Sequence, residues 1–393
     1  MAAVKLATGI YWVGGIDWNL RSFHGYLTQR GSTYNAYLIV DEKIVLVDTV
    51  KHYLYDEMVS RIKEVIDPSR IDYIVSNHTE MDHSGCLPKI LRLAKNAVVI
   101  ASPNGEKGLK KHFLNNWNFK IVKTGDVINI GKRTIKFVLA PMVHWPDSMV
   151  TYIPEEKILL SNDAFGQHIA SFARFDDETE LGIVKEEAAK YYANIVLPFG
   201  KQVKKLLSEV SCFDIKMIAS SHGVIWRTHT SDIVELYKKW ADNVVEKRAV
   251  IIYDTMWGST ERIAYAISEV FSQEGIPYSV KSLQTTHISD IMTEILSAKY
   301  ICVGSPTLNN EMLPPVASFL TYLKGLAPRN RIGIAFGSYG WGGQSIAKIG
   351  RVFMESGFRV PVEGFKIQYV PHINELEDIK SKVREVIKEA GDG

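Results

Sequence analysis

The spacing of hydrophobic and polar positions changes near residue 247. Up to that point, short apolar runs alternate with loops rich in glycine, asparagine and aspartate. Beyond it, strand-like and helix-like segments alternate in units of about 25 to 30 residues, as in parallel α/β sheets. Between the two patterns, residues 231–247 predict a packed amphipathic helix whose apolar face contains Ile233, Leu236, Tyr237, Trp240 and Val244. We therefore expect an α/β protein with two domains, residues 1–247 and 248–393.

Composition and charge exclude several classes of function. The chain has 393 residues, of which 46% are hydrophobic and 23% charged, and this is typical of a globular protein of two domains. A net charge of +2 gives no basis for binding nucleic acid or an anionic membrane. No apolar run approaches the roughly 20 residues of a membrane helix, and the N-terminus lacks a secretory signal, so we predict a cytoplasmic protein.

Cysteine usage bears on electron transfer. The three cysteines, Cys86, Cys212 and Cys302, form no CxxC pair. This argues against a disulfide framework and against a rubredoxin or iron–sulfur module within the chain. If the protein needs electrons, they must come from a separate donor.

The segment 77–83 holds four metal-binding side chain types in six residues: His78, Glu80, Asp82 and His83. It follows an apolar run, residues 71–76, that predicts a buried strand, and it precedes a predicted helix that opens at Ser84. Loops between a strand and a helix hold reactive side chains on a rigid scaffold. The spacing therefore indicates a metal site more strongly than a packing role.

Polar residues end three further predicted strands of the first domain. The strand 136–140 leads to His144, the strand 157–162 ends at Asp163, and the strand 216–221 ends at His222. If these strands lie in two stacked sheets, their ends can converge on one rim. The prediction is a site with seven candidate ligands.

The order HxExDH, then His, Asp and His, resembles the metal domain of flavodiiron proteins, also called A-type flavoproteins, along the whole chain. The resemblance implies an αββα metallo-β-lactamase-like sandwich that holds a non-haem di-iron centre. By position, His78, Glu80 and His144 would bind one iron and Asp82, His83 and His222 the other, with Asp163 as the bridge. His24 and Tyr191 resemble positions beside the irons that supply protons or order water.

The chemistry of the ligand set also favours iron. Hydrolytic relatives of the same sandwich usually have a histidine where this chain has Glu80, and three imidazoles at one metal suit zinc. Four imidazoles and three carboxylates favour a harder, redox-active metal. A zinc hydrolase fused to a flavin domain remains the first alternative, and metal analysis of anaerobically purified protein distinguishes the two.

The second domain opens with a buried strand, residues 248–254, and a loop before a helix from Glu261. Hydroxyls and backbone amides at a helix N-terminus bind phosphate, and the Gly-Lys-Ser/Thr end of a Walker A loop is missing. The loop resembles the FMN phosphate loop of flavodoxins, and its candidate contacts are Thr255, Met256, Trp257, Gly258, Ser259 and Thr260.

Two further loops fit a flavin site. They follow the predicted strands 300–304 and 331–336, and their candidate contacts are Pro306, Thr307, Leu308, Asn309 and Asn310 in one, and Ser338, Tyr339, Gly340, Trp341, Gly342 and Gly343 in the other. In a flavodoxin-like doubly wound parallel sheet of order 2-1-3-4-5, ligands bind beyond the carboxyl ends of neighbouring strands. The three loops are therefore expected to share one crevice.

The resemblance implies a function for this pair of sites. FMN would pass electrons to two iron ions, which would reduce dioxygen to water, nitric oxide to nitrous oxide, or both, as scavenging in an anaerobe-type metabolism. The implied donor is rubredoxin, another flavoprotein or a reduced deazaflavin coenzyme. A head-to-tail homodimer, or a dimer of dimers, would bring the flavin of one subunit to the irons of the other. A second alternative is an electron-carrying flavodoxin with an inert sandwich domain.

Overall fold

The computed structural model describes residues 2–391, and the chain forms two compact units. The first consists of the chain up to Tyr191 together with Phe199–Ala241, and the second of Tyr192–Pro198 together with the chain from Asp242. The helix predicted over 231–247 is shorter than expected: α7 (Thr230–Ala241) stops before Asn243, whose φ of +50° cannot continue a helix. Val244 is consequently exposed, and Lys247 belongs to strand β17 (Glu246–Tyr253).

The first unit contains a mixed sheet of seven strands within the described residues, in the order β1-β2-β7-β8-β9-β10-β11. Neighbouring strands from β1 to β8 are antiparallel, and those from β8 to β11 are parallel. The bounds are β1 (Val4–Ala7), β2 (Ile10–Trp12), β7 (Tyr37–Val40), β8 (Ile44–Val47), β9 (Tyr73–Ser76), β10 (Val98–Ala101) and β11 (Phe119–Ile121).

A second sheet of five strands, β12-β13-β14-β15-β16, packs face to face with the first over the described residues. Its strands are β12 (Val127–Asn129), β13 (Thr134–Leu139), β14 (Met149–Ile153), β15 (Ile158–Asn162) and β16 (Met217–Ser220). Two small hairpins complete the strands of this unit: β3 (Gly15–Asp17) with β6 (Ser32–Tyr34), and β4 (Ser22–Phe23) with β5 (Tyr26–Leu27). Val45 and Val75 of one sheet meet Phe137 and Leu160 of the other in a shared apolar core. Burial on both faces explains why these strands are apolar runs.

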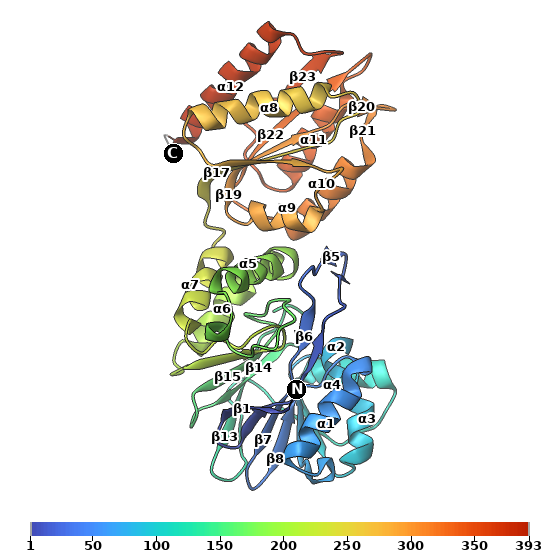
Figure 1. Cartoon of the computed structure of the whole chain (residues 1–393), viewed down its shortest axis with the longest axis vertical. Coiled ribbons are helices and arrows are strands. Elements are labelled where there is room, and N and C mark those ends of the chain that lie inside the picture. Colours follow the sequence, from blue (N-terminus) through green and yellow to red (C-terminus); the bar gives the residue numbers. More distant parts are fainter. Residues whose placement is uncertain (1, 392–393) are drawn as a thin grey trace. The chain divides into compact units, whose positions relative to one another are not determined.

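Helices cover the outer faces of the two sheets. Those on the first sheet are α1 (Tyr55–Val65), α2 (Met81–Ser84), α3 (Leu87–Leu93) and α4 (Pro103–Phe113), and those of the second layer are α5 (Leu181–Tyr191), α6 (Gly200–Val210) and α7. Figure 1 shows the two groups on opposite sides of the sheets. The predicted αββα sandwich is confirmed.

The second unit is a parallel sheet in the order β18-β17-β19-β22-β23 over the described residues, which confirms the expected order 2-1-3-4-5. Its other strands are β18 (Tyr278–Ser282), β19 (Ala298–Gly304), β22 (Ile332–Tyr339) and β23 (Phe365–Gln368), with a hairpin of β20 (Thr307–Leu308) and β21 (Glu311–Met312). The helices are α8 (Ser259–Gln273), α9 (Ile288–Ile295), α10 (Pro314–Leu326), α11 (Gln344–Glu355) and α12 (Ile373–Gly391). Figure 1 shows α8 and α12 on one face of this sheet and α9 and α10 on the other.

Membrane-spanning helices are absent from residues 2–391, because every helix there is too short or too polar to cross a bilayer.

Candidate metal centre and flavin crevice

The candidate metal ligands stand at the ends of strands of both sheets. Strand β9 leads into His78, and Glu80 precedes α2, so that Asp82 and His83 lie in the first turn of this helix. In place of one helix from Ser84, the structure has α2, which ends at Ser84, and then α3, which begins at Leu87. Asp163 directly follows β15, and His222 lies just beyond β16. The parallel pairing of β15 with β16 places these last two strand ends side by side.

All seven candidate ligands come together in the interior of the first unit. Their donor atoms form two groups, each within 4.8 Å: one of His78, Glu80, His144 and Asp163, the other of Asp82, His83 and His222. Each of the seven side chains is buried. Buried carboxylates need compensating positive charge, which bound metal ions would supply.

Asp163 links the two groups. Its Oδ2 lies 3.5 Å from Nε2 of His78 and 3.4 Å from Nε2 of His144. Its Oδ1 lies 3.0 Å from Nε2 of His83 and 3.3 Å from Nε2 of His222. A carboxylate that presents one oxygen to each group is arranged to bridge two metal ions.

The remaining carboxylates complete each group. Glu80 Oε2 lies 3.2 Å from Nε2 of His78, and Asp82 Oδ2 lies 3.5 Å from Nε2 of His222. These separations are close to the edge of a coordination polyhedron, about 3 to 3.4 Å for ligands about 2.1 Å from the metal. The oxygens of Asp82 and Asp163 also lack well-formed hydrogen bonds in the described structure. The residues present therefore fit a pair of metal ions.

The hydrogen bonds of the ring nitrogens that face away from the site also indicate metal binding. The Nδ1–H of His222 donates to the carbonyl oxygen of Thr33 at 2.9 Å, and a carbonyl can only accept. The Nδ1–H of His78 donates to Oδ2 of Asp147 at 3.0 Å. In both rings Nε2 is thereby left as the atom that faces the carboxylates, and its lone pair is available to a metal.

Neighbouring charges shift the pKa values of several candidate ligands. Burial alone would lower the pKa of these imidazoles, but Asp147 and Glu80 raise the pKa of His78 to about 10. In the same way, Asp163 and Glu80 raise the pKa of His144 to about 10. Burial would raise the pKa of Asp163, yet the surrounding imidazoles hold it well below its ordinary value. Without metal, the carboxylates keep protons on the rings, and metal ions would take the place of those protons.

Asp48 also supports the site, although no sequence motif indicates it. It follows β8, is buried, and adopts a φ of +56°. Its Oδ1 accepts from the backbone N–H of Asn77 at 2.8 Å, and its Oδ2 accepts from the amide of Asn77 at 3.1 Å. This carboxylate therefore fixes the residue that precedes His78. The sequence feature that could have indicated Asp48 is the one that it shares with the candidate ligands, namely a polar residue at the end of an apolar strand.

Both residues that were expected beside the irons, His24 and Tyr191, lie close to the candidate ligands. His24 has a φ of +51° in the loop between β4 and β5, and its Nε2 lies 2.5 Å from Oε1 of Glu80. This hydrogen bond raises the pKa of His24. Tyr191 is buried at the end of α5, with its ring centroid 5.9 Å from that of His222.

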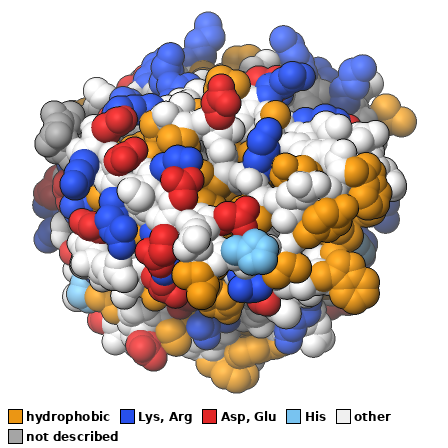
Figure 2. All heavy atoms as spheres, turned by 90° about the horizontal axis from the view of Figure 1, so that it is seen from above, with side chains coloured by type: hydrophobic (Ala, Val, Ile, Leu, Met, Phe, Trp, Pro, Cys, Tyr) orange, Lys and Arg blue, Asp and Glu red, His pale blue; other side chains and the backbone are white. Residues whose placement is uncertain are grey.

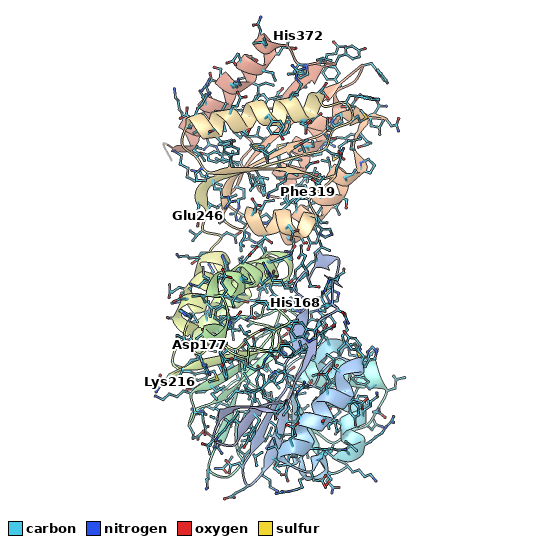
Figure 3. The ribbon with its side chains drawn as sticks, viewed as in Figure 1. His168, Asp177, Lys216, Glu246, Phe319 and His372 are labelled. Carbon is cyan, nitrogen blue, oxygen red and sulfur yellow. The ribbon has the colours of Figure 1, made fainter. Side chains whose placement is uncertain are left out.

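His168 is also buried beside the metal site. Its ring centroid lies 4.7 Å from that of His222, and its Nδ1 lies 2.7 Å from Oγ of Ser32. Figure 3 labels it in the interior of the first unit. It packs behind a candidate ligand and does not belong to either ligand group.

The second unit contains a crevice of about 530 Å³ at the carboxyl ends of β17, β19 and β22. All three predicted loops contribute to its lining, through Met256, Trp257, Ser259, Pro306, Thr307, Leu308, Asn309, Asn310, Ser338, Tyr339, Gly340, Trp341 and Gly342. Thr255, Gly258, Thr260 and Gly343 were also predicted, but they are not among the residues that line the crevice. Tyr369, which no sequence motif indicates, also lines the crevice, from the loop after β23.

Local structure explains how these loops are held. Gly258 precedes α8 with a φ of +82°, a conformation that glycine adopts without strain. Its N–H donates to Oγ1 of Thr255 at 3.1 Å, and Oγ1 of Thr260 lies 3.0 Å from Oγ of Ser338. Three of the four predicted residues outside the lining therefore shape the loop.

The crevice fits a flavin nucleotide. Its volume lies within the usual range of small-molecule sites, about 300 to 1,000 Å³. The N-terminus of α8, with Ser259 at its first position, offers unpaired backbone N–H groups to a phosphate. Trp257 and Trp341 are each 93% exposed, and exposed indoles at a crevice are suited to stack on a flat ring.

Comparisons with known proteins cover both units. The family model described as ODP family beta lactamase matches residues 33–223, and the flavodoxin model matches residues 251–382. A nitric oxide reductase of Moorella thermoacetica is 46% identical over 95% of each chain. The chain belongs to the flavodiiron protein family.

Solved structures of flavodiiron proteins have the same fold over nearly the whole chain. The rubredoxin oxygen:oxidoreductase of Desulfovibrio gigas is 41% identical, with a TM-score of 0.95 over 97% of each chain. The flavodiiron protein of Giardia intestinalis is 33% identical, with a TM-score of 0.96 over 99% of this chain and 97% of that one. The two matched family segments contain all seven candidate ligands and every residue that lines the crevice.

Proposed function

We propose that this flavodiiron protein takes electrons through FMN to a di-iron centre and reduces dioxygen to water, nitric oxide to nitrous oxide, or both. The observation that carries the proposal is the pair of buried ligand groups joined by Asp163, in a chain that also has a flavin-sized crevice. When bound, FMN relays electrons and the two irons supply the redox-active site that reduces the gas. Relatives named nitric oxide reductase and rubredoxin oxygen:oxidoreductase support the two substrates.

The surroundings of the ligands suit a small apolar gas. The rings of Phe23, Tyr34 and Tyr191 lie around His222, with centroids 6.2, 5.5 and 5.9 Å from its ring. Aromatic walls keep bulk water away from buried charges and strengthen the electrostatic interactions between them. The chain therefore offers a dry site in which rigidly held carboxylates and imidazoles surround the reacting gas.

His24 and Tyr191 are proposed to assist the reaction. His24 holds Oε1 of Glu80 and leaves Oε2 directed toward His78 and His144. Its side chain is also 60% exposed, so that it links the buried carboxylate to solvent and can order water or move a proton. Tyr191 is proposed to order water beside His222.

Electron delivery and assembly follow from the family. The proposed donor is a separate protein or coenzyme, such as rubredoxin, another flavoprotein or a reduced deazaflavin, acting in the cytoplasm. The proposed assembly is a head-to-tail homodimer or a dimer of dimers. The exposed apolar residues around the crevice support an interface there: Trp257, Trp341, Tyr369 and Val370. Figure 2 shows hydrophobic side chains gathered at one side of a face of the molecule. A monomer with full activity in sedimentation and kinetic experiments would contradict this assembly.

Metal analysis and gas consumption test the proposed function together. Protein purified without oxygen should contain two irons and one FMN per chain. With a chemically reduced donor, it should consume dioxygen or nitric oxide, and separate assays with each gas establish the preference. Zinc in place of iron, together with hydrolytic activity, would favour the hydrolase. A preparation with both irons and FMN that consumes neither gas would refute the proposal.

A further inference from the structure

Three of the four imidazoles of the metal site differ at Nδ1, the nitrogen that faces away from it. His78 donates from Nδ1 to the carboxylate of Asp147, whereas His222 donates to the neutral carbonyl of Thr33. The Nδ1 of His83 is buried without a hydrogen-bond partner in the described structure. Apart from the shared Asp163, each ligand group contains two imidazoles and one carboxylate. The two ligand groups therefore differ in the hydrogen-bond partners of their imidazoles and not in the types of their ligands.

Asp147 is built into the half of the site formed by His78, Glu80 and His144. It is only 5% exposed, and the oxygen that accepts from His78 also accepts from the backbone N–H of Thr79 at 2.7 Å. Its own carbonyl accepts from Oγ of Ser102 at 2.7 Å, which fixes the backbone at this point. Because Asp147 lies three residues after His144, its side chain ties the two segments that carry His78 and His144.

We infer that Asp147 is a positioning residue that strengthens metal binding selectively at the half formed by His78, Glu80 and His144. A carboxylate behind a metal-binding imidazole fixes its tautomer and orientation and makes Nε2 a better donor. The inference rests on the proposed metal site and goes beyond its ligand assignment.

His24 is expected to weaken metal binding at the same half of the site. Its ring lies 2.5 Å from Glu80 and draws charge from that ligand. The inference is therefore tested by comparing variants with the wild type, and not by ranking the two metal positions in the wild type.

The experiment measures release of Zn²⁺ to a chelator from the full-length, FMN-loaded protein after metal exchange. Loss of an outer partner of a metal-binding histidine typically costs about 10 to 100-fold in metal affinity. In Asp147→Ala, one metal per chain should leave about 10 to 100-fold faster, while the other leaves at the wild-type rate. Asp147→Asn keeps an acceptor oxygen of similar shape but loses the charge, and it should show a smaller acceleration of the same phase.

Asp176→Asn is the matched control. Asp176 is a buried carboxylate that belongs to neither ligand group and accepts from the backbone N–H groups of Arg227 and His229. It should leave both release phases unchanged, even if the melting temperature falls. Equal acceleration of both phases in Asp147→Ala, no acceleration, or the same change in Asp176→Asn would overturn the inference. Because Zn²⁺ release does not depend on gas reduction, this outcome is separate from the fate of the proposed function.

Discussion

The metal site and the flavin crevice are built in opposite ways. The seven candidate ligands are buried, and hydrogen bonds from other buried groups hold several of them, such as Asp147 behind His78. The crevice is lined by surface loops, and two of its tryptophans are almost fully exposed. A buried ligand set held by a rigid scaffold discriminates among metals through geometry. An open, loop-lined crevice favours access by an electron donor and by other protein surfaces.

Asp163→Asn should give the largest effect and should separate the two sites. It removes the charge that bridges the two ligand groups, and each oxygen of this carboxylate faces two imidazoles. We expect gas consumption to fall at least about 100-fold, together with a loss of bound metal, because even outer partners of metal ligands cost up to that much.

The control for this variant is the flavin. FMN per chain and the flavin absorbance spectrum should match the wild type, because the crevice belongs to the other unit. Unchanged gas turnover in Asp163→Asn would contradict the proposed metal centre.

Two tryptophans test the contrast between burial and exposure. Trp226 is fully buried in the first unit and donates from Nε1 to the carbonyl of Phe165 at 2.9 Å. Trp226→Ala should lower the free energy of unfolding by about 3 to 5 kcal/mol. Trp341→Ala should change it by less than about 0.5 kcal/mol, because this side chain is exposed, yet it should weaken FMN binding. Chemical denaturation and flavin titration measure the two effects, and a large loss of stability in Trp341→Ala would show that the indole is packed.

The convergence of the seven candidate ligands could be predicted from the sequence for a physical reason. Each candidate lies after an apolar strand, and the strand ends of a sandwich converge, so that Asp163 and His222 could be expected near the segment 77–83 without any knowledge of their contacts. Contacts such as that of Asp147 with His78 were not predictable, because they join residues far apart in the chain whose individual types are ordinary. The predicted helix 231–247 extends beyond the end of α7, because the apolar spacing continues through Val244 although the backbone turns at Asn243.

The lining of the crevice could also be predicted only in part from the sequence. Its three main loops are contiguous and lie after neighbouring parallel strands, where the topology predicts a ligand. Tyr369 escaped prediction because it comes from a fourth strand end, that of β23, with no motif around it.

Ser259→Ala tests the proposed phosphate end of the crevice. Ser259 begins α8 and lines the cavity, so that its hydroxyl is placed to donate to a phosphate. A hydrogen bond to a charged group contributes about 1.5 to 3 kcal/mol, and we expect FMN to bind at least about 10-fold more weakly. Fluorescence titration of the flavin-free protein measures the affinity. Ser272→Ala, on the exposed far end of the same helix, should bind FMN as the wild type does. Equal affinities in the two variants would exclude this role for Ser259.

The smallest expected effect concerns the hairpin β20–β21, which lines the crevice through its turn. Asn309 and Asn310 have φ values of +53° and +61°, as in the two-residue turns that favour asparagine and glycine. Asn310→Ala should cost about 1 kcal/mol, because alanine lacks the short polar side chain with which asparagine can hydrogen-bond locally in this left-handed conformation, whereas Asn310→Gly should be neutral. FMN affinity should follow the same order and change by only a few-fold in the alanine variant. If Asn310→Gly weakens FMN binding as much as Asn310→Ala, then the amide group itself contacts the flavin, and the open crevice has a specific polar contact like those of the buried site.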